Sequence, residues 1–306
     1  YKTTGVYYRG RFSLVDIVGC KCLAYPKRLA VKAVQRDTDR EEEWLPRLAS
    51  SFVPALLCSF ETPKLLYLVE EFLPGDLLTH SLVARGREYT EHTVAALARQ
   101  LLEALRFCHS RGLFHLHLEP GNVMVQRRMA SHVAELVKLV DLSDSRALHE
   151  LKELSTTPAA AAASKKERIK PLTKAFTAPE YTLSGQFSTA SDIWSLGSFI
   201  YLLLTGTSAL PLEDTTKEDS DLLYKSINFR IFSKLTRDAR RFVYNTPKLK
   251  PNERGSIQFW SENRWLSLRA DHISELKKHK IQTENLRQFN VNYSKLKSDN
   301  AKFAEK

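Results

Sequence analysis

The sequence lacks a long apolar run and any cysteine spacing that is typical of a redox or zinc site. Its most apolar stretch, residues 193–204, has about 12 residues, whereas a membrane-spanning helix needs about 20. We therefore expect this stretch to form a buried core helix. Cysteines are few and include no Cys-x-x-Cys pair; they are Cys20, Cys22, Cys58 and Cys108. This pattern predicts free thiols in a reducing compartment rather than disulfides.

The chain also lacks an initiator methionine, a recognisable secretory signal and an internal repeat. It begins at Tyr1, and its two methionines are Met124 and Met129. From the first two features we expect a piece of a longer cytoplasmic polypeptide, and the third indicates that this piece is not a repeat array.

Composition and charge narrow the class of protein. Of the 306 residues, 43% are hydrophobic and 10% aromatic, which is enough to bury a core and excludes wholesale disorder. Lys+Arg exceed Asp+Glu by 46 − 35, giving a net charge of +11. A nucleic-acid-binding module would interleave basic and aromatic residues, but the basic pairs Lys165-Lys166, Arg240-Arg241 and Lys277-Lys278 are dispersed. We expect neither nucleic acid nor a membrane as partner; the charge fits acidic protein partners or solubility.

Apolar periodicity divides the chain into a small strand-rich part and a larger helical part. Strands are predicted at residues 12–15, 29–34, 65–69, 122–125 and 136–140. Residues 37–48 have the spacing of an amphipathic helix. Thr90 is a plausible N-cap for a longer helix that ends at Gly112. The layout predicts a strand-rich lobe followed by a helical one.

We predict domain boundaries at 1–74, 75–266 and 267–306, with residues 147–174 as an insertion in the second part. The insertion contains the run Ala159–Ala163, which fits either an irregular excursion or a weak helix. In the last part, Thr283 is a candidate cap for a helix. Its apolar stripe would be Leu286, Phe289, Tyr293 and Leu296.

Several short motifs occur in the order used for phosphoryl transfer. That chemistry needs a strand lysine held by a helix glutamate, a base on a loop, and an Asn and an Asp for the metal ion. The matching residues are Ala30-Val31-Lys32, Glu41, Asn122, Asp141, Ala178-Pro179-Glu180, Asp192-Ile193-Trp194-Ser195-Leu196-Gly197 and Arg254. In this order the chain resembles the protein kinase family over essentially its whole length to Leu266.

The resemblance implies an α+β fold of two lobes, the bilobal protein kinase fold. A small β-rich N-lobe would precede a larger α-helical C-lobe and a C-terminal extension. It also implies that Lys32 pairs with Glu41, although Glu42 and Glu43 leave the register open. Structural roles are implied for Glu180, Arg254 and Asp192, with Glu180 and Arg254 pairing to lock the end of the activation segment.

The catalytic loop departs from the family pattern at the residues that carry the chemistry. Kinases have His-Arg-Asp-Leu-Lys-Pro-x-Asn where residues 115–122 of this chain are His-Leu-His-Leu-Glu-Pro-Gly-Asn. His117 therefore replaces the aspartate base, and Glu119 reverses the sign of the loop lysine. A negative charge beside a transferring phosphoryl group opposes the reaction, and loss of a positioned base costs about 10²–10⁴ in rate. Leu116 replaces the arginine that in many kinases receives an activation-loop phosphate.

The nucleotide-binding motifs are also degraded. The three positions of the phosphate-binding glycines hold Tyr8, Gly10 and Ser13, and side chains there obstruct the approach of backbone N–H groups to phosphate. Ser143 replaces the glycine after Asp141-Leu142. Glu70 places an acidic side chain where the family has an apolar residue beside the adenine pocket.

Lys32, Glu41, Asn122 and Asp141, which match the family pattern, admit two interpretations. They are vestigial residues with structural roles, or they bind nucleotide with magnesium. We expect no cofactor, with ATP and magnesium binding as the alternative. His117 could act as a substitute base, because an imidazole titrates near neutral pH. Phosphotransfer would then have to proceed beside the negative charge of Glu119.

The last forty or so residues resemble the C-terminal regulatory extension of the giant muscle kinases titin, twitchin and obscurin, which packs between the lobes. With the missing catalytic aspartate, the resemblance is greatest to an inactive obscurin-type kinase domain. A free basic amphipathic tail that binds a calmodulin-like partner is the competing interpretation.

These features together predict a pseudokinase that acts as a protein-binding scaffold in the cytoplasm, within the sarcomere. Its expected partners are other proteins, such as another kinase or a sarcomeric component, and its own tail. The alternative is a weak or atypical Ser/Thr protein kinase that is regulated by the tail.

Overall fold

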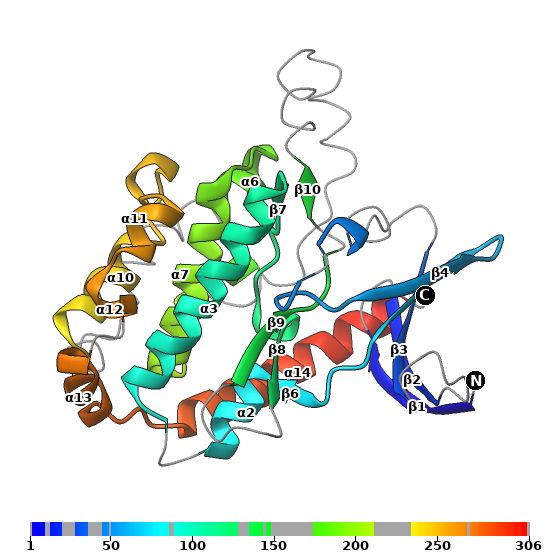
Figure 1. Ribbon diagram of the computed structural model, residues 1–306, viewed down its shortest axis with the longest axis horizontal. Helices are drawn as coiled ribbons and strands as arrows, with labels where there is room; N and C mark the ends of the chain where they lie inside the picture. Colours follow the sequence, from blue (N-terminus) through cyan, green and yellow to red (C-terminus); the bar gives the residue numbers. More distant parts are fainter. Residues whose placement is uncertain are drawn as a thin grey trace. The chain divides into compact units, whose positions relative to one another are not determined.

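The computed structural model in Figure 1 describes most of the chain and forms two compact units. The described residues are 2–9, 13–19, 28–35, 45–48, 50–85, 89–127, 135–142, 145–147, 174–210, 234–267 and 270–304. The first unit comprises 1–76, 124–144 and 292–306, and the second comprises 77–123 and 145–291. The three-part division expected from the sequence stays a prediction, and the insertion 147–174 lies almost wholly outside the described residues.

The first unit is built on a five-stranded antiparallel sheet. Its strands are β1 (Lys2–Arg9), β2 (Ser13–Gly19), β3 (Arg28–Gln35), β4 (Leu56–Glu61) and β5 (Leu65–Glu71), in the order β1-β2-β3-β5-β4. Val18, Leu29 and Val69 form a buried cluster on adjacent strands. β-branched side chains pack well on such a pleated, half-buried surface. The three predicted N-terminal strands are confirmed. Of the helix predicted at 37–48, the structure describes a 3₁₀ turn, η1 (Leu45–Leu48).

A second, three-stranded sheet has the order β6-β8-β9, with β6 (Gly75–Leu77), β8 (Val123–Arg127) and β9 (Glu135–Leu139). A Cβ at Gly75 would lie 1.9 Å from the Val125 carbonyl oxygen, so only glycine allows this close approach. In the first unit the buried Lys138 on β9 donates to Glu71 at 2.7 Å.

The second unit is mainly helical, and α3 and α7 pack against each other at its centre (Figure 1). Its elements are α2 (Leu78–Arg85), α3 (Glu91–Ser110), β7 (Leu113–Phe114), η3 (Pro120–Asn122), β10 (Arg146–Ala147), η4 (Lys174–Phe176), α6 (Pro179–Ser184), α7 (Thr189–Thr205), α10 (Arg237–Asn245), η5 (Pro251–Glu253), α11 (Ile257–Ser261), α12 (Arg264–Ser267) and α13 (Ala270–Lys278). Thr90 caps α3, as predicted. α7 is buried along nearly its whole length, which confirms the predicted core helix. Among the helices described, none is sufficiently long and apolar to span a membrane.

A buried carboxylate that the sequence analysis did not single out joins three helices of this unit. Glu91, in the first turn of α3, is fully buried. It accepts hydrogen bonds from the backbone N–H of Thr236 at 3.0 Å, from the Thr236 hydroxyl, and from Trp265 Nε1 at 3.0 Å. Because an unpaired buried charge is costly, these donors fix α10 and α12 against the start of α3.

The C-terminal extension packs on the second unit through α13 and the first part of α14 (Glu284–Ala304). His279 accepts from the Glu91 N–H at 2.9 Å, and Ile281 donates its N–H to Tyr89 at 3.0 Å. Leu286 and Phe289 of α14 are buried. The predicted helix and its apolar stripe are confirmed, and the tail is docked rather than free.

An aromatic series links α14 to the core of the second unit. The Phe289 ring meets Phe176 edge-on at 6.5 Å between centroids, and Phe176 meets Phe199 of α7 at 6.3 Å. Edge-to-face pairs of this kind stabilise by about 0.5–1.5 kcal/mol beyond the buried area. The contacts anchor the start of α14 to the rest of the second unit.

Substitution of Gly206 tests this docking. Gly206 ends α7 at φ 74, and an added Cβ would lie 2.7 Å from the Leu286 nitrogen and 2.6 Å from Asn285 Cβ. We expect Gly206→Ala to lower the free energy of unfolding by about 2–4 kcal/mol, from backbone strain plus the clash. The measurement is urea unfolding.

Gly185→Ala is the matched control, because Gly185 ends α6 at the same φ of 74. It should cost about 1–2 kcal/mol from the left-handed backbone alone. Equal losses in the two variants would contradict close seating of α14 on Gly206.

Candidate functional site

Lys32 and Asp141 form an ion pair within the first unit. Lys32 lies in the middle of β3, opposite Val15 on β2 and Leu68 on β5, and is only 6% exposed. Its Nζ lies 2.9 Å from Asp141 Oδ1. Asp141 follows β9 at φ 76, a left-handed conformation that Asp tolerates better than most residues. The structure therefore brings together two of the four residues predicted as vestigial.

Other predicted positions of the first unit are less fully described. Glu41, Gly10 and Ser143 lie outside the described residues, so the Lys32–Glu41 pair stays a prediction. Tyr8 and Ser13 lie on β1 and β2. Glu70 is half-buried on β5, paired with Ala30 on one side and Leu56 on the other.

His117 contacts polar side chains of its own loop through both ring nitrogens. Asn122 Nδ2 lies 3.2 Å from His117 Nδ1 and donates to the His117 carbonyl at 3.0 Å. Glu119 Oε2 lies 3.4 Å from His117 Nε2. The Glu119 side chain is fully buried and Asn122 is 1% exposed. The two replaced catalytic residues and the retained asparagine therefore form one compact cluster.

The burial of Glu119 adds a feature that the sequence did not reveal. From the motif alone, its carboxylate is a negative charge at the position of a lysine that faces phosphate. The structure places the carboxylate inside the loop, where a buried charge needs a partner. His117 Nε2, 3.4 Å from Glu119 Oε2, is within reach to be that partner.

Leu116 occupies an apolar cluster instead of an anion-binding position. It is 2% exposed at φ 61 and packs with Phe114 and Phe187, with Tyr181 at the edge. The Phe114 and Phe187 rings meet at 5.5 Å in an edge-on arrangement. An apolar cluster offers no donor to a phosphate group, which agrees with the expectation from the sequence.

Asp192, in the first turn of α7, holds the backbone of the catalytic loop. It accepts the N–H of His115 at 3.0 Å and of Leu116 at 2.7 Å, and His109 Nε2 lies 2.7 Å away. Burial alone would raise the pKa of Asp192. The hydrogen bond and charge of His109, with the charge of His115 and the Leu116 N–H, outweigh burial and lower this pKa.

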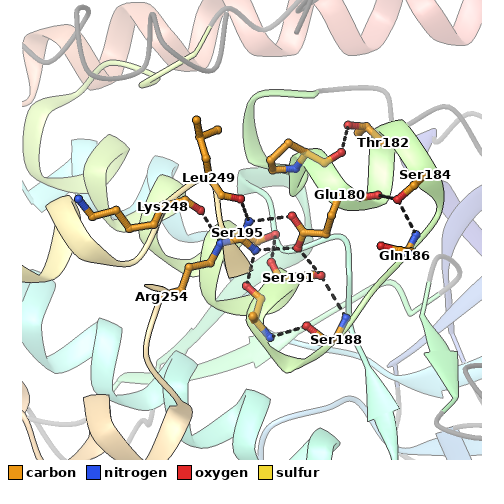
Figure 2. A network of polar contacts seen from close by, with 12 residues as sticks. Glu180, Thr182, Ser184, Gln186, Ser188, Ser191, Ser195, Lys248, Leu249 and Arg254 are labelled. Carbon is orange, nitrogen blue, oxygen red and sulfur yellow. Dashed lines mark hydrogen bonds and ion pairs between the residues drawn. The ribbon is translucent and has the colours of Figure 1, made fainter. Parts of the chain in front are cut away.

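Figure 2 shows the pairing of Arg254 with Glu180 that the resemblance implied. The two guanidinium Nη atoms donate to the two carboxylate oxygens at 2.7 Å each. Arg254 also donates to the carbonyls of Lys248 at 2.6 Å, Leu249 at 3.0 Å and Ala190 at 2.9 Å. These contacts connect α6, α7 and the segment before η5.

Neighbouring side chains extend this network. Ser191 Oγ donates to Glu180 Oε1 at 2.7 Å, and Trp260 Nε1 donates to the Arg254 carbonyl at 2.7 Å. The centroid of the Trp194 ring lies 5.0 Å from Cζ of the Arg254 guanidinium, which is a cation–π contact. The network is structural, since Arg254 is fully buried.

The model of the protein kinase domain family matches residues 3–266 of the chain. This chain belongs to the protein kinase domain family. The β-sheet unit is the kinase N-lobe and the helical unit is the C-lobe, so the predicted fold is confirmed.

Among curated proteins, the chain is 26% identical over 247 residues to myosin light chain kinase 2, skeletal/cardiac muscle, of Bos taurus. That match covers 77% of this chain and 36% of the relative. It is 28% identical over 216 residues to serine/threonine-protein kinase 17A of Oryctolagus cuniculus, covering 68% and 49%. The chain thus spans between a third and a half of these relatives.

Among solved structures, the twitchin kinase region of C. elegans aligns with a TM-score of 0.73 at 21% identity, covering 98% of this chain and 50% of that one. The autoinhibited serine kinase domain of the giant muscle protein titin aligns with a TM-score of 0.70 at 21% identity, covering 94% and 86%. At this identity the likeness shows the fold. The chain therefore resembles muscle kinases in both comparisons.

The structure also identifies two residues that support the fold of the second unit and that no motif had indicated. His109 and Glu91 both make buried contacts, but each partner lies far away in the sequence. A charged residue inside an apolar helical stripe is the one signal that points to such a contact.

Asp192→Asn tests the support of the catalytic loop. The amide removes the charge and one of the accepting oxygens, so we expect a loss of about 2–4 kcal/mol in unfolding free energy at pH 7. Because the folded-state pKa of Asp192 is lowered, its contribution is present above the unfolded pKa and disappears as pH falls through the folded pKa. The difference from wild type should therefore shrink in acid.

The measurement is chemical unfolding of both proteins from pH 7 down to about pH 3, a range that brackets the usual Asp pKa. The exposed Asp76→Asn is the control and should change little. A difference at Asp192 that is independent of pH would contradict the role of its charge.

Proposed function

We propose that this kinase domain is a pseudokinase whose activity is protein binding. The proposal is carried by the contact of His117 with Glu119 at 3.4 Å and with Asn122 at 3.2 Å. These residues stand where the family has its base, its loop lysine and its metal-binding asparagine. In the structure their side chains contact one another in one cluster.

The geometry of His117 argues against a substitute base. A general base needs an acceptor atom within hydrogen-bond reach of the substrate proton. Nδ1 of His117 lies 3.2 Å from Asn122 Nδ2, and Nε2 lies 3.4 Å from Glu119 Oε2. Acceptance of a substrate proton at Nδ1 would require that the contact with the Asn122 amide be broken.

Magnesium and ATP are the partners that the family implies. Asp141 and Asn122 each carry an oxygen atom of the type that magnesium prefers, and Lys32, 2.9 Å from Asp141, is of the type that contacts phosphate. One Asp141 oxygen is already paired with Lys32, and Asn122 Nδ2 with His117. We propose that these residues stabilise the fold and that function does not depend on ATP or magnesium.

The muscle relatives support a sarcomeric setting for this domain. We propose an obscurin-type domain within a large cytoplasmic protein of the sarcomere, where the retained kinase fold presents a rigid surface to other proteins. The docked tail, α13 and the start of α14, would be part of that surface. Another kinase or a sarcomeric component is the expected partner.

The runner-up is a weak or atypical Ser/Thr kinase regulated by the tail. The retained pair of Lys32 and Asp141 at 2.9 Å is the observation that favours it. Lys32 and Asp141 would then bind nucleotide and metal, and the transfer would proceed slowly without a positioned base.

Phosphate transfer separates the two proposals. The wild-type domain, incubated with Mg-ATP and a generic basic peptide, should incorporate no more phosphate into itself or the peptide than Lys32→Ala does. The measurement is intact-mass spectrometry of both products. Transfer by wild type that Lys32→Ala abolishes would overturn the pseudokinase proposal and support the runner-up.

The same proteins test nucleotide binding. Mg-ATP should leave the melting temperature of wild type unchanged, as it leaves that of Asp141→Ala. A rise of several degrees that is lost in Asp141→Ala would sink the claim that function is independent of ATP.

A further inference from the structure

Helix α10 in the second unit presents an exposed basic face. Arg237, Arg240, Arg241 and Tyr244 occupy positions i, i+3, i+4 and i+7, which places them on one side of a helix. Arg237, Arg241 and Tyr244 are exposed, and Arg240 is half-exposed. Over this part of the helix the face is about 10 Å long.

The opposite face of α10 is fixed in the core. Ala239, Phe242 and Val243 are buried. The Phe242 ring contacts Trp260 at 4.9 Å and Trp265 at 5.2 Å between centroids. The basic face is therefore held rigidly outward, and changes on it should leave the core intact.

Lys248 extends this face beyond the end of the helix. Its Nζ lies 3.7 Å from the centroid of the Tyr244 ring, which is a cation–π distance. Tyr244 is 45% exposed, so an apolar surface remains open beside the cations. We name the set of Arg237, Arg240, Arg241, Tyr244 and Lys248 the α10 basic face.

The arginines of this face have no carboxylate partner in the part of the chain that is described. Arg237, Arg240 and Arg241 form no ion pair there. The one carboxylate on α10, Asp238, lies in the first turn, where negative charge suits the helix N-terminus. Among the described residues no carboxylate pairs with these three guanidinium groups, so they can pair with an external anion.

We propose that the α10 basic face docks an acidic protein segment, in which carboxylates surround one aromatic or apolar side chain. The carboxylates would pair with the arginines, whose planar forks suit bidentate contact. The apolar side chain would pack on Tyr244. This docking proposal specifies the class of partner for the protein-binding function proposed above, and it rests on that function.

The shape of the face favours a peptide over a nucleic acid or a lipid surface. The cations follow a single short helix. Specific protein–DNA interfaces, in contrast, bury about 1,000–2,500 Å² of protein surface. Membrane-surface helices combine basic residues with a broad apolar face turned to the lipid. On α10 the apolar face is turned into the protein core.

The test is fluorescence anisotropy of a synthetic Glu-rich peptide with one central Phe, titrated with the whole chain. Arg237→Gln/Arg241→Gln should weaken binding by about 3- to 10-fold, since each exposed ion pair contributes modestly. Tyr244→Ala should weaken it by a similar factor. Lys278→Gln/Lys295→Gln removes the same charge from other exposed positions and should change affinity by less than about twofold.

Equal weakening in the two double variants, or no binding by wild type, would overturn the proposal. Tighter binding of a single-stranded oligothymidylate or of phosphatidylserine vesicles than of the peptide, lost in Arg237→Gln/Arg241→Gln, would overturn it in favour of those ligands. Melting curves report whether each variant is folded. Because no step of this experiment depends on phosphate transfer, its failure is distinguishable from failure of the pseudokinase proposal.

Discussion

The buried guanidinium of Arg254 is the constraint on which the large unit depends. A buried Arg is tolerated only when its charge and donors are matched. Its five N–H donors correspond to contacts with both oxygens of Glu180 and with the carbonyls of Lys248, Leu249 and Ala190. Removal of either partner would leave a buried charge unmatched, so α6 and the segment before η5 are held together against α7.

The same helix also supports the catalytic loop. One turn of α7 carries Ser191, which contacts Glu180, and Asp192, which accepts the backbone N–H groups of residues 115 and 116. The kinase scaffold is therefore retained at the points that fix loop geometry. What has changed are side chains on the loop itself. His117 and Glu119 replace a base and a cation, and their side chains lie 3.4 Å apart inside the loop.

Motifs allowed much of this arrangement to be predicted. The pair of Glu180 and Arg254, the core helix α7 and the capped helix α3 follow from local signals whose spacing is well defined. Lys32 contacts Asp141 in the structure, and the pair of Lys32 with Glu41 that the resemblance implied stays a prediction. The tail helix was predicted from the period of its apolar residues. Its packing against Gly206 and Phe176 was not predicted, because it depends on the shape of surfaces that are distant in the sequence.

The contacts that sequence could not supply are those in which a buried charge meets a partner far along the chain. Glu91 with Trp265 and Asp192 with His109 are examples. The inward orientation of Glu119 belongs to this class, although its partner is only two residues away. The motif showed the sign reversal, and only the structure shows that the carboxylate is buried beside His117. This pairing turns a missing catalytic group into a structural contact.

The most direct test of this account is a double-mutant cycle on the catalytic loop. The free energy of unfolding would be measured for wild type, His117→Asp, Glu119→Lys and the double variant. His117→Asp places two carboxylates together and Glu119→Lys buries a cation beside the imidazole, so each should cost about 2–4 kcal/mol. The account predicts that the double variant, with opposite charges restored, loses less than the sum by about 1–3 kcal/mol. Losses that simply add would contradict it, because His117 and Glu119 would then not act as a structural pair.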